Sequence, residues 1–555
     1  MIKKERKKTA KQIEKERIKK LCDSLDHVAY RTPMGTVFYP YMKGDSKYLE
    51  ASDGEYDPLR HIYIPYTGFI LPYNGAPSYL SRYRAYYEIR KFAPDYEIID
   101  IPMIQPVMMD HKYHLRNIDT FRTAQSEIIN RIEGNRFKER SWFVNLQTGE
   151  GKTLLSIYLA SRFGYKTWLF CFSNDVLDQW IDGLDRYTSM DTSKILRCHS
   201  YEFDRILDGR INVHDYDIYV STLTGLDMYA KKKQNYHIIN DLFSKIGIGL
   251  MIVDEAHRNI GNIVRFNSVL NVKYQLYLSA DFGQGDYKHD QLFRKVFDQV
   301  PVLRPEEETR KSLKYTKVIR YDFNTHPTRL QEDSVFDKYG YDCQMYMIYE
   351  FQKGTIINVI RSIVSQAQYM KSECKRILIL FTNIAHCDIT TYVLRKYFPY
   401  LTIGAYHSGI SSEEKLETKN YADVIVGTYS SFGVGLDTED IKIVITTDNC
   451  NRVFDNQAAG RARRLRDGTE AMYFLLIDEG FSYAKKKAVV RLNYLKETKA
   501  KDDEIQHYTY NEKEFPYEDP RELIEEARRA TGHGSDESEY ESERVDDPEV
   551  EFDDL

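Results

Sequence analysis

Short apolar stretches alternate with helix-like stretches along the chain, and this alternation predicts two α/β units in succession. In the first half, between about residues 115 and 325, the apolar stretches have the length of strands. They are expected at 142–144, 166–172, 217–221, 246–254 and 273–280. Strands that alternate with helices form a parallel sheet with helices on both of its faces.

The same alternation returns after a looser connection around 300–350. Strands are expected at 376–381, 401–406, 423–428, 441–446 and 471–477. A basic helical stretch then follows at 480–498, and a further helix is expected at 520–530. No residue-level repeat relates the two halves, so two separate sheets of similar size are predicted.

The stretches outside these units differ in texture. Residues 1–21 are basic and read as an exposed helix or arm. Residues 22–112 place Tyr, Pro and Gly between short β-like runs, such as 36–39 and 61–65, which predicts a small α+β accessory domain. Aromatic and basic residues interleave between 79 and 91, which suits either nucleic-acid stacking or helix packing.

The chain ends in an acidic tail. From Ser535 to Leu555 there are 11 acidic residues, and Arg544 is the one basic residue. This segment has too few apolar residues to fold in isolation. The tail is expected to be disordered. It either occupies a basic nucleic-acid groove of the same chain, recruits a basic or apolar partner through Phe552 and Leu555, or solubilises the protein. The predicted domains are therefore 1–21, 22–112, 113–325, 326–500, a helical extension at 501–534, and the tail at 535–555.

Composition and charge narrow the class of protein. Hydrophobic residues make up 42% and charged residues 29%, and no apolar run approaches the roughly 18–20 residues that span a bilayer. The basic N-terminus lacks the apolar core of a secretory signal. The seven cysteines form no C-x-x-C pair, which argues against a zinc ribbon or disulfide framework and favours a reducing compartment. A cytoplasmic location without membrane contact is expected.

The net charge of −6 conceals an asymmetry. The tail alone contributes −10, so the remaining chain carries +4. A mildly basic body is compatible with nucleic-acid binding, and equally with ordinary surface charge.

The segment NLQTGEGKT at 145–153 lies between an expected strand and an expected helix. Such a turn points several backbone N–H groups at one anion site. Lys152 adds a charge for the outer phosphates of a nucleotide, and Thr153 adds a hydroxyl for Mg²⁺. The residues that form the cradle are Thr148, Gly149, Glu150 and Gly151. Leu146 replaces the usual first glycine of this motif. The alternative is a Gly-rich turn that is followed by Lys-Thr and has no role in nucleotide binding.

A second carboxylate-bearing segment, MIVDEAH at 251–257, follows about a hundred residues later. Asp254 stands at the carboxyl end of a strand, where α/β sheets bind ligands, and there it can share Mg²⁺ with Thr153. Glu255 is placed to orient or deprotonate an attacking water. Without the first motif, this acidic pair would more often be a salt-bridged pair.

Together, TGEGKT and DEAH resemble a superfamily 2 helicase or translocase of the DEAH/DEAD type. The resemblance implies two tandem RecA-like lobes of the P-loop NTPase fold, with ATP and Mg²⁺ as cofactors and nucleic acid as partner. The segment YTGFILP at 66–72 is similar to phage and viral UvsW-like and to XPB-like DNA helicases. That similarity implies a role in DNA recombination, repair or fork processing. The compact core, the tyrosine-rich composition and the absence of long insertions suit a viral origin, with the host cytoplasm as location.

The remaining motifs occur in the order that this family has. Gln125, in FRTAQ, resembles the glutamine that reads adenine, and Asp437, in GLD, belongs to a motif that faces both ATP and nucleic acid. QAAGRARR at 457–464 fits Q-x-x-G-R-x-x-R and implies that Arg461 and Arg464 act as arginine fingers beside Lys152 and Glu255. The implied contacts to the nucleic-acid backbone are Ser173, Thr222, Thr382, His407 and Thr428.

One motif departs from the family, and two other functions stay open. Asp281 stands where the family has a threonine after Ser-Ala, which leaves the coupling of hydrolysis to movement open. A viral transcription-associated helicase acting on RNA or RNA–DNA is one alternative. The other is a helicase-fold scaffold with an idle motor, against which the presence of Lys152, Asp254, Glu255 and Arg464 argues. A restriction translocase is less favoured, because no nuclease or methyltransferase motif is found.

Overall fold

The computed structural model divides the chain into two compact units, the first made mostly of residues before 304 and the second mostly of residues from 305 onward. The residues that it describes are 25–32, 35–40, 54–57, 62–65, 78–80, 97–116, 121–147, 149–233, 235, 237–280, 297, 300–312, 314–337, 340–369, 376–432, 441–447, 455, 458–461, 471–511, 513 and 518–533.

The first unit is built on a seven-stranded parallel sheet with the order β13-β7-β12-β11-β8-β10-β9. Its strands are β7 (Ser141–Asn145), β8 (Thr167–Cys171), β9 (Ile195–Arg197), β10 (Ile218–Thr222), β11 (Leu250–Val253), β12 (Tyr274–Ser279) and β13 (Val302–Leu303). The central strands are buried along their whole length, as in a parallel sheet that is covered on both faces.

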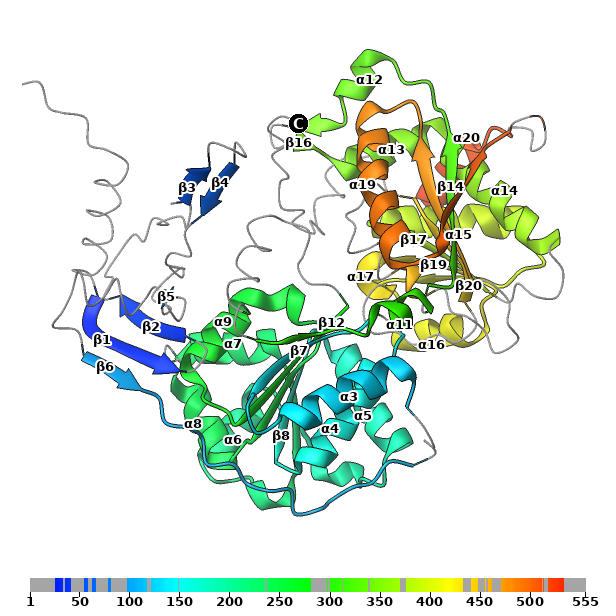
Figure 1. The fold of residues 1–555 in the computed structure, drawn as a ribbon. Coiled ribbons are helices and arrows are strands. Elements are labelled where there is room, and N and C mark those ends of the chain that lie inside the picture. Colours follow the sequence, from blue (N-terminus) through cyan, green and yellow to red (C-terminus); the bar gives the residue numbers. More distant parts are fainter. Residues whose placement is uncertain are drawn as a thin grey trace, which may run out of the picture. The chain divides into compact units, whose positions relative to one another are not determined.

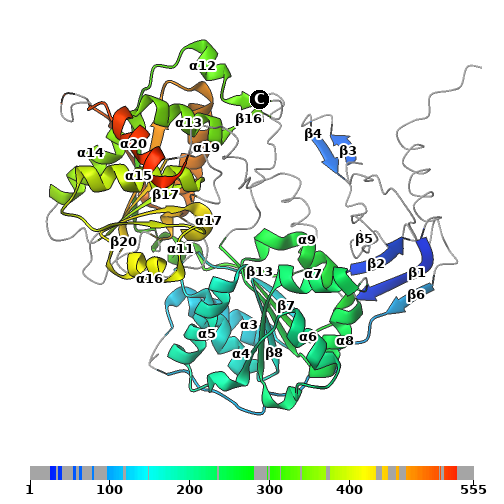
Figure 2. The same ribbon diagram turned by 180° about the vertical axis from the view of Figure 1, so that it is seen from behind.

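Helices cover both faces of this sheet (Figures 1 and 2). On one side lie α3 (Thr123–Asn135), α4 (Lys152–Phe163) and α5 (Asn174–Tyr187). On the other side lie α6 (Ser200–Leu207), α7 (Leu223–Lys233), α8 (His237–Ile246) and α9 (Ile260–Val269), with aromatic side chains packed against those of β8. Short 3₁₀ turns occur at η1 (Thr192–Lys194), η2 (Val213–Asp215) and η3 (Ala256–Asn259).

A separate four-stranded sheet precedes this unit's main sheet in sequence, with the order β5-β2-β1-β6. Its strands are β1 (Leu25–Thr32), β2 (Gly35–Pro40), β5 (Ser78–Leu80) and β6 (Glu97–Asp100). Two more strands, β3 (Gly54–Asp57) and β4 (Ile62–Pro65), form an antiparallel ladder. The strands expected at 36–39 and 61–65 coincide with β2 and β4, whereas the predicted basic arm and acidic tail lie outside the described residues.

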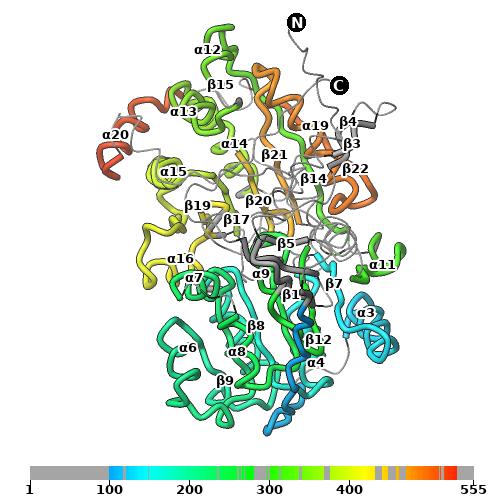
Figure 3. The backbone as a smooth tube through the Cα atoms, turned by 90° about the vertical axis from the view of Figure 1, so that its left-hand side faces the viewer, coloured from blue at the N-terminus to red at the C-terminus, as the bar shows by residue number. Residues whose placement is uncertain are grey.

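The second unit is built on another seven-stranded parallel sheet, with the order β18-β19-β17-β20-β21-β14-β22. Figure 3 shows most of these strands side by side in that order. The strands are β14 (Thr316–Phe323), β17 (Arg376–Phe381), β18 (Ile403–Tyr406), β19 (Val424–Thr428), β20 (Ile441–Thr446), β21 (Ala471–Asp478) and β22 (Ala500–Thr509). The two parallel-sheet α/β units confirm the predicted fold class of two tandem RecA-like lobes.

The helices of the second unit and one small hairpin complete it. The helices are α11 (Glu307–Ser312), α12 (Arg329–Asp333), α13 (Cys343–Lys353), α14 (Thr355–Tyr369), α15 (Ile384–Tyr397), α16 (Ser412–Tyr421), α17 (Tyr429–Phe432), α19 (Ser482–Thr498) and α20 (Arg521–Thr531). The hairpin pairs β15 (Phe336–Asp337) with β16 (Gly340–Tyr341). The helices expected at 480–498 and 520–530 therefore coincide with α19 and α20.

Three expectations differ from the observed elements. β14 belongs to the second sheet although it precedes the boundary expected at 325/326. β22 occupies part of the expected helical extension; it is an edge strand with mostly exposed side chains, so its sequence lacks a buried face to signal a strand. The strand expected at 246–254 starts only at Leu250, because α8 ends at Ile246 and Gly247 takes a φ of 80°.

No described helix combines the length and the apolar character that crossing a bilayer requires. The described cysteines Cys171, Cys198, Cys343 and Cys387 are free thiols.

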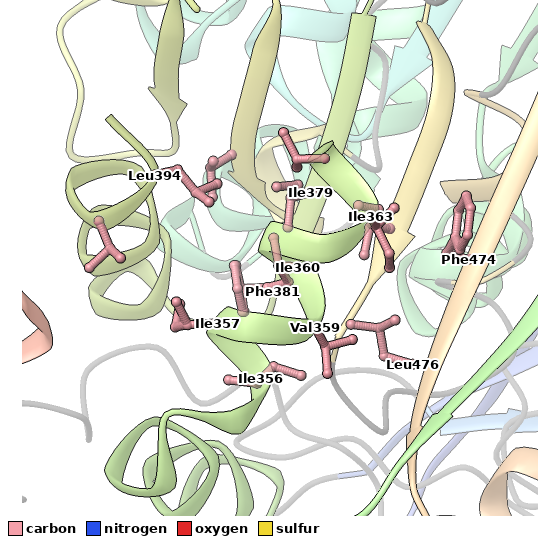
Figure 4. Close-up of a cluster of buried hydrophobic side chains, with 14 of the residues drawn as sticks. Ile356, Ile357, Val359, Ile360, Ile363, Ile379, Phe381, Leu394, Phe474 and Leu476 are labelled. Carbon is pink, nitrogen blue, oxygen red and sulfur yellow. The ribbon is translucent and has the colours of Figure 1, made fainter. Parts of the chain in front are cut away.

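The core of the second unit lies where α14 meets the sheet (Figure 4). Ile356, Ile360 and Ile363 of α14 are buried together with Ile379 of β17 and Leu476 of β21. Because these side chains come from segments far apart in sequence, this cluster ties the helix to the sheet.

Replacing Ile360 by Ala should leave a cavity and lower the free energy of unfolding of this unit by about 2–5 kcal/mol. Ile360 is fully buried. The measurement is hydrogen exchange at the amides of β17 and β21, which reports the stability of this unit separately. Leu416→Ala is the control, because Leu416 is 58% exposed on α16 and its truncation should change the stability by less than about 0.5 kcal/mol. Equal exchange in both variants would contradict the packing described for α14.

Candidate functional site

The Gly-rich loop joins β7 to α4, as the sequence predicts. Gly149 and Gly151 adopt φ values of 86° and 85°, a left-handed conformation that favours glycine. The carboxylate of Glu150 accepts a hydrogen bond of 2.8 Å from the backbone N–H of Gln147, and so closes the turn from within. Leu146 is fully buried, so the position where the usual motif has glycine is here a core position. Thr148 lies outside the described residues.

Lys152 and Glu255 meet at the end of this loop. Lys152 is the first residue of α4, and its Nζ lies 3.4 Å from Oε1 of Glu255, which follows β11. The two side chains are only 10% and 16% exposed. Glu255 has φ 47° and ψ 48°, a left-handed conformation that non-glycine residues rarely adopt. The fold thus brings together two residues that are a hundred positions apart, at a strained backbone position of the kind common at functional sites.

Asp254 is held by two neutral donors. Trp180 Nε1 donates to Oδ2 at 2.9 Å, and the backbone N–H of Glu255 donates to Oδ1 at 3.0 Å. The reach of the Trp180 indole to Asp254 depends on how α5 packs on the sheet, beside β8 and β10. No pattern in the sequence reveals that contact.

Burial and neighbouring charges shift the pKa values of the two adjacent carboxyl groups, Asp254 and Glu255, in opposite directions. Burial raises the pKa of Asp254, and the negative charge of Glu255 raises it further. Burial also raises the pKa of Glu255, but the positive charge of Lys152 and then those of His257 and Arg258 outweigh it, so the net pKa is lowered. Glu255 therefore stays ionised, while the charge of Asp254 lacks an adequate partner within the protein.

This donor set fits Mg²⁺. The hydrogen bonds to Asp254 from Trp180 and Glu255 N–H come from neutral donors, and the charge of Lys152 only partly offsets the effect of burial. A bound cation would therefore stabilise this carboxylate further, and carboxylate and hydroxyl oxygens are ligands that Mg²⁺ accepts. Asp254 and Thr153 are the residues that would hold it. Among the described residues there is no cluster of three or more His, Cys, Asp or Glu side chains of the kind that binds a metal through protein ligands alone.

The segment after Glu255 is connected to the end of β12. His257 Nδ1 lies 2.6 Å from Ser279 Oγ and 3.3 Å from Glu255 Oε2, and both His257 and Ser279 are buried. A displacement of Glu255 would therefore move His257 and, through its contact with Oγ, Ser279 as well. Asp281, which departs from the family pattern, lies outside the described residues.

Gln125 occupies the first turn of α3 and is 2% exposed. Its Oε1 accepts a hydrogen bond of 2.9 Å from the backbone N–H of Arg122, so its side chain caps the helix. The adenine-reading role of Gln125 stays a prediction.

Two expected nucleic-acid contacts of the first unit follow neighbouring strands. Ser173 caps α5 after β8, without a side-chain cap hydrogen bond. Thr222 ends β10, and its hydroxyl accepts a hydrogen bond of 3.0 Å from Gly225 N–H. Since β8 pairs in parallel with both β10 and β11, these residues lie at the same edge of the sheet as Asp254.

In the second unit, Thr382, His407 and Thr428 lie at the carboxyl ends of the adjacent strands β17, β18 and β19. His407 is 2% exposed; its Nε2 lies 2.8 Å from Asp388 Oδ1, and its Nδ1 accepts from Gly409 N–H at 3.2 Å. Its imidazole thus shapes the turn at 407–409, and any contact with a ligand would come from the backbone or Ser408. Sequence analysis missed Asp388, which also binds His533 Nε2 at 2.8 Å.

Arg461 is buried in the second unit, and its backbone N–H donates to Ala458 O at 2.9 Å. Asp437 and Arg464 lie outside the described residues, so their roles stay predictions. The two candidate fingers and the Lys152–Glu255 pair belong to different units.

Comparisons with known proteins agree with the resemblance to superfamily 2 helicases. A family model described as the res subunit of type III restriction enzymes matches residues 118–283. A protein of Acanthamoeba polyphaga mimivirus, named as a candidate ATP-dependent RNA helicase, is 24% identical over 359 residues, which cover 63% of this chain and 63% of that protein. The chain thus aligns with less than two thirds of that relative's length.

Two further relatives are also helicases by name. A candidate helicase of Escherichia phage T5 is 22% identical over 384 residues, covering 67% of this chain and 73% of that protein. The helicase/translocase subunit XPB of the general transcription and DNA repair factor IIH of Encephalitozoon cuniculi is 26% identical over 166 residues, covering 29% and 24%.

The left-handed glycines of the loop generate a prediction with a matched control. Gly151→Ala should lower the free energy of unfolding by about 1–2 kcal/mol, because a Cβ is strained at this φ. Gly134→Ala should instead raise it by up to about 1 kcal/mol, because Gly134 lies in α3 with open space around the added Cβ. All three tryptophans, Trp142, Trp168 and Trp180, lie in the first unit, whose strand β7 and helix α4 directly flank the loop, so urea unfolding followed by tryptophan fluorescence measures both changes. Shifts of the same sign would contradict the loop conformation.

Proposed function

The chain is related to the superfamily 2 helicases, and from this relationship we propose that it is an ATP- and Mg²⁺-dependent motor that moves on or remodels nucleic acid. The observation that carries the proposal is the meeting of Lys152 with Glu255, beside the buried Asp254. A phosphate-binding lysine, a metal-binding acid and an ionised base at one sheet edge are the groups that ATP hydrolysis requires.

Each residue has a defined part in this reaction. The backbone N–H groups from Gly149 to Thr153 bind the phosphates, and Lys152 exchanges its contact with Glu255 for the outer phosphates. Thr153 and Asp254 would hold Mg²⁺, and the ion, when bound, would supply positive charge that neutralises the phosphate oxygens. The low pKa of Glu255 leaves it ionised, so that it accepts a hydrogen bond from the attacking water and orients it. Gln125 and Asp437 complete the nucleotide site.

The second lobe contributes positive charge. Arg461 and Arg464 stabilise the negative charge that spreads over the transferring phosphoryl group. Because they belong to a different lobe from Lys152, hydrolysis requires the two lobes to close around the nucleotide, and closure couples chemistry to movement.

Nucleic acid is bound through its backbone by Ser173, Thr222, Thr382 and Thr428 and by the turn that His407 shapes. Contacts to phosphate carry no sequence preference. We favour DNA and a role in recombination, repair or fork processing, since one relative is named for DNA repair. RNA or RNA–DNA is the second candidate, because the mimivirus relative is named for RNA. Relatives in a phage and a giant virus support a viral origin, and with it a location in the host cytoplasm. The acidic tail is proposed, from its charge alone, as a site for a protein partner.

The proposal is tested by ATP turnover with forked, Holliday-junction, duplex, single-stranded DNA and RNA substrates. We expect stimulation, strongest by branched or duplex DNA. Lys152→Ala should lower the turnover by roughly a few hundredfold, because it removes the charge that meets the phosphates. Arg131→Ala is the control, since Arg131 is exposed on α3 and its guanidinium donates a hydrogen bond of 2.9 Å to the Arg304 carbonyl. Nucleic-acid-stimulated turnover that persists in a folded Lys152→Ala protein would refute the motor assignment, and strongest stimulation by RNA would favour the second candidate.

The arginine fingers should separate nucleotide binding from turnover. Arg464→Ala should lose about 10³-fold in turnover while keeping most of its affinity for a fluorescent ATP analogue, since the first lobe holds the ground-state nucleotide. Arg461→Ala should be impaired as well, and Arg463→Ala, one position away, is the matched control. A loss confined to Arg463→Ala would show that the motif is aligned incorrectly.

A further inference from the structure

A buried ion pair lies next to the segment that carries Arg461. The guanidinium of Arg491, on α19, donates from Nε to Asp455 Oδ2 at 2.5 Å and from Nη2 to Asp455 Oδ1 at 2.7 Å. Tyr473, on β21, donates its hydroxyl to Asp455 Oδ1 at 2.6 Å. Arg491 and Asp455 are 1% and 0% exposed, so both charges are removed from water.

This cluster, here called the Asp455 anchor (Asp455, Tyr473 and Arg491), fixes one end of the QAAGR segment. The backbone is helical at Asp455 and again at Ala458 and Ala459. The two alanines are buried in the core formed by β20, β21 and α19, and the turn that follows is closed by the hydrogen bond from Arg461 N–H to Ala458 O. Arg461 is therefore only a few residues from Asp455 along a backbone that is fixed at both points.

We infer that the Asp455 anchor is a positioning device for the arginine fingers, with Arg491 and Tyr473 as its positioning residues. The bidentate pairing fixes the carboxylate in both distance and plane, which a single hydrogen bond would not do. The hydroxyl of Tyr473, on β21, fixes the Asp455 carboxylate from a second element. The position of Asp455 is thereby set by groups on two separate elements, α19 and β21.

The energetics of buried ion pairs indicate that the Asp455 anchor contributes defined geometry more than it contributes stability. Replacing a buried ion pair by apolar residues of similar volume often leaves stability unchanged or raises it. Such a pair contributes defined geometry, and geometry decides whether a guanidinium reaches a phosphoryl group. A displacement of about 1 Å away from the reacting atoms can cost roughly 10²-fold in rate.

The inference rests on the proposed ATPase function, and its mildest test removes one hydroxyl group. Tyr473→Phe should lower kcat by roughly tenfold, leave the affinity for a fluorescent ATP analogue unchanged, and speed hydrogen exchange at the amides of Ala458 to Arg461. Tyr321→Phe is the matched control: Tyr321 is also a buried tyrosine of the same sheet, and its hydroxyl lies 3.2 Å from Ser362 Oγ, on α14. The control should change neither kcat nor exchange in the finger segment.

A second variant separates positioning from folding. The double variant Asp455→Leu with Arg491→Met fills the space of the ion pair with apolar side chains of similar volume. It should therefore retain the unfolding midpoint, whereas its turnover should fall by roughly a hundredfold. Normal kcat in this folded double variant, or equal effects of Tyr473→Phe and Tyr321→Phe, would overturn the inference. If the unaltered protein hydrolyses no ATP, the proposed function fails, and the exchange measurement still decides the anchor: unchanged exchange at Ala458 to Arg461 in Tyr473→Phe would refute it.

Discussion

The placement of two adjacent carboxylates in a nearly dry position at the end of β11 is the constraint on which the rest of the first unit depends. Their desolvation and mutual repulsion oppose folding, and both have to be offset by groups from elsewhere. Lys152 comes from α4, Trp180 from α5, and His257 from the turn that follows. The helices α4 and α5 and the turn after Glu255 must therefore pack correctly against the sheet before these side chains come together.

The order of the strands makes this possible. β11 lies between β12 and β8, and β12 separates it from β7. The loop after β7, the acids after β11 and Ser279 at the end of β12 consequently share one edge, although they are far apart in sequence. The chain of contacts from Lys152 through Glu255 and His257 to Ser279 crosses that edge. A parallel sheet with a different strand order would carry the same motifs and would not bring them together.

The parts of the structure that sequence predicts are those with a local signal. Buried parallel strands are continuous apolar runs, and the Gly-rich loop and acidic strand end are short segments with fixed spacing. Features that depend on distant packing were not predictable: the reach of Trp180 to Asp254, the inward orientation of His407, and the Asp455 anchor. β22 was missed for another reason, since an exposed edge strand lacks an apolar face.

Three buried carboxylates of this protein show why distant packing matters. Asp455 has a charged, bidentate partner and a hydroxyl donor, so nothing further is required of its surroundings. Glu350 is fully buried near Asp478; burial, then the charge of Asp478, raises its pKa well above the usual range and favours the neutral acid. Asp254 has neutral donors and a raised pKa, yet it lies at the open edge of a sheet beside a phosphate loop. Of the three, only Asp254 lies at the carboxyl end of a central strand, at the same sheet edge as the Lys152–Glu255 pair, and this position is the reason for proposing it, and not the other two, as a metal ligand.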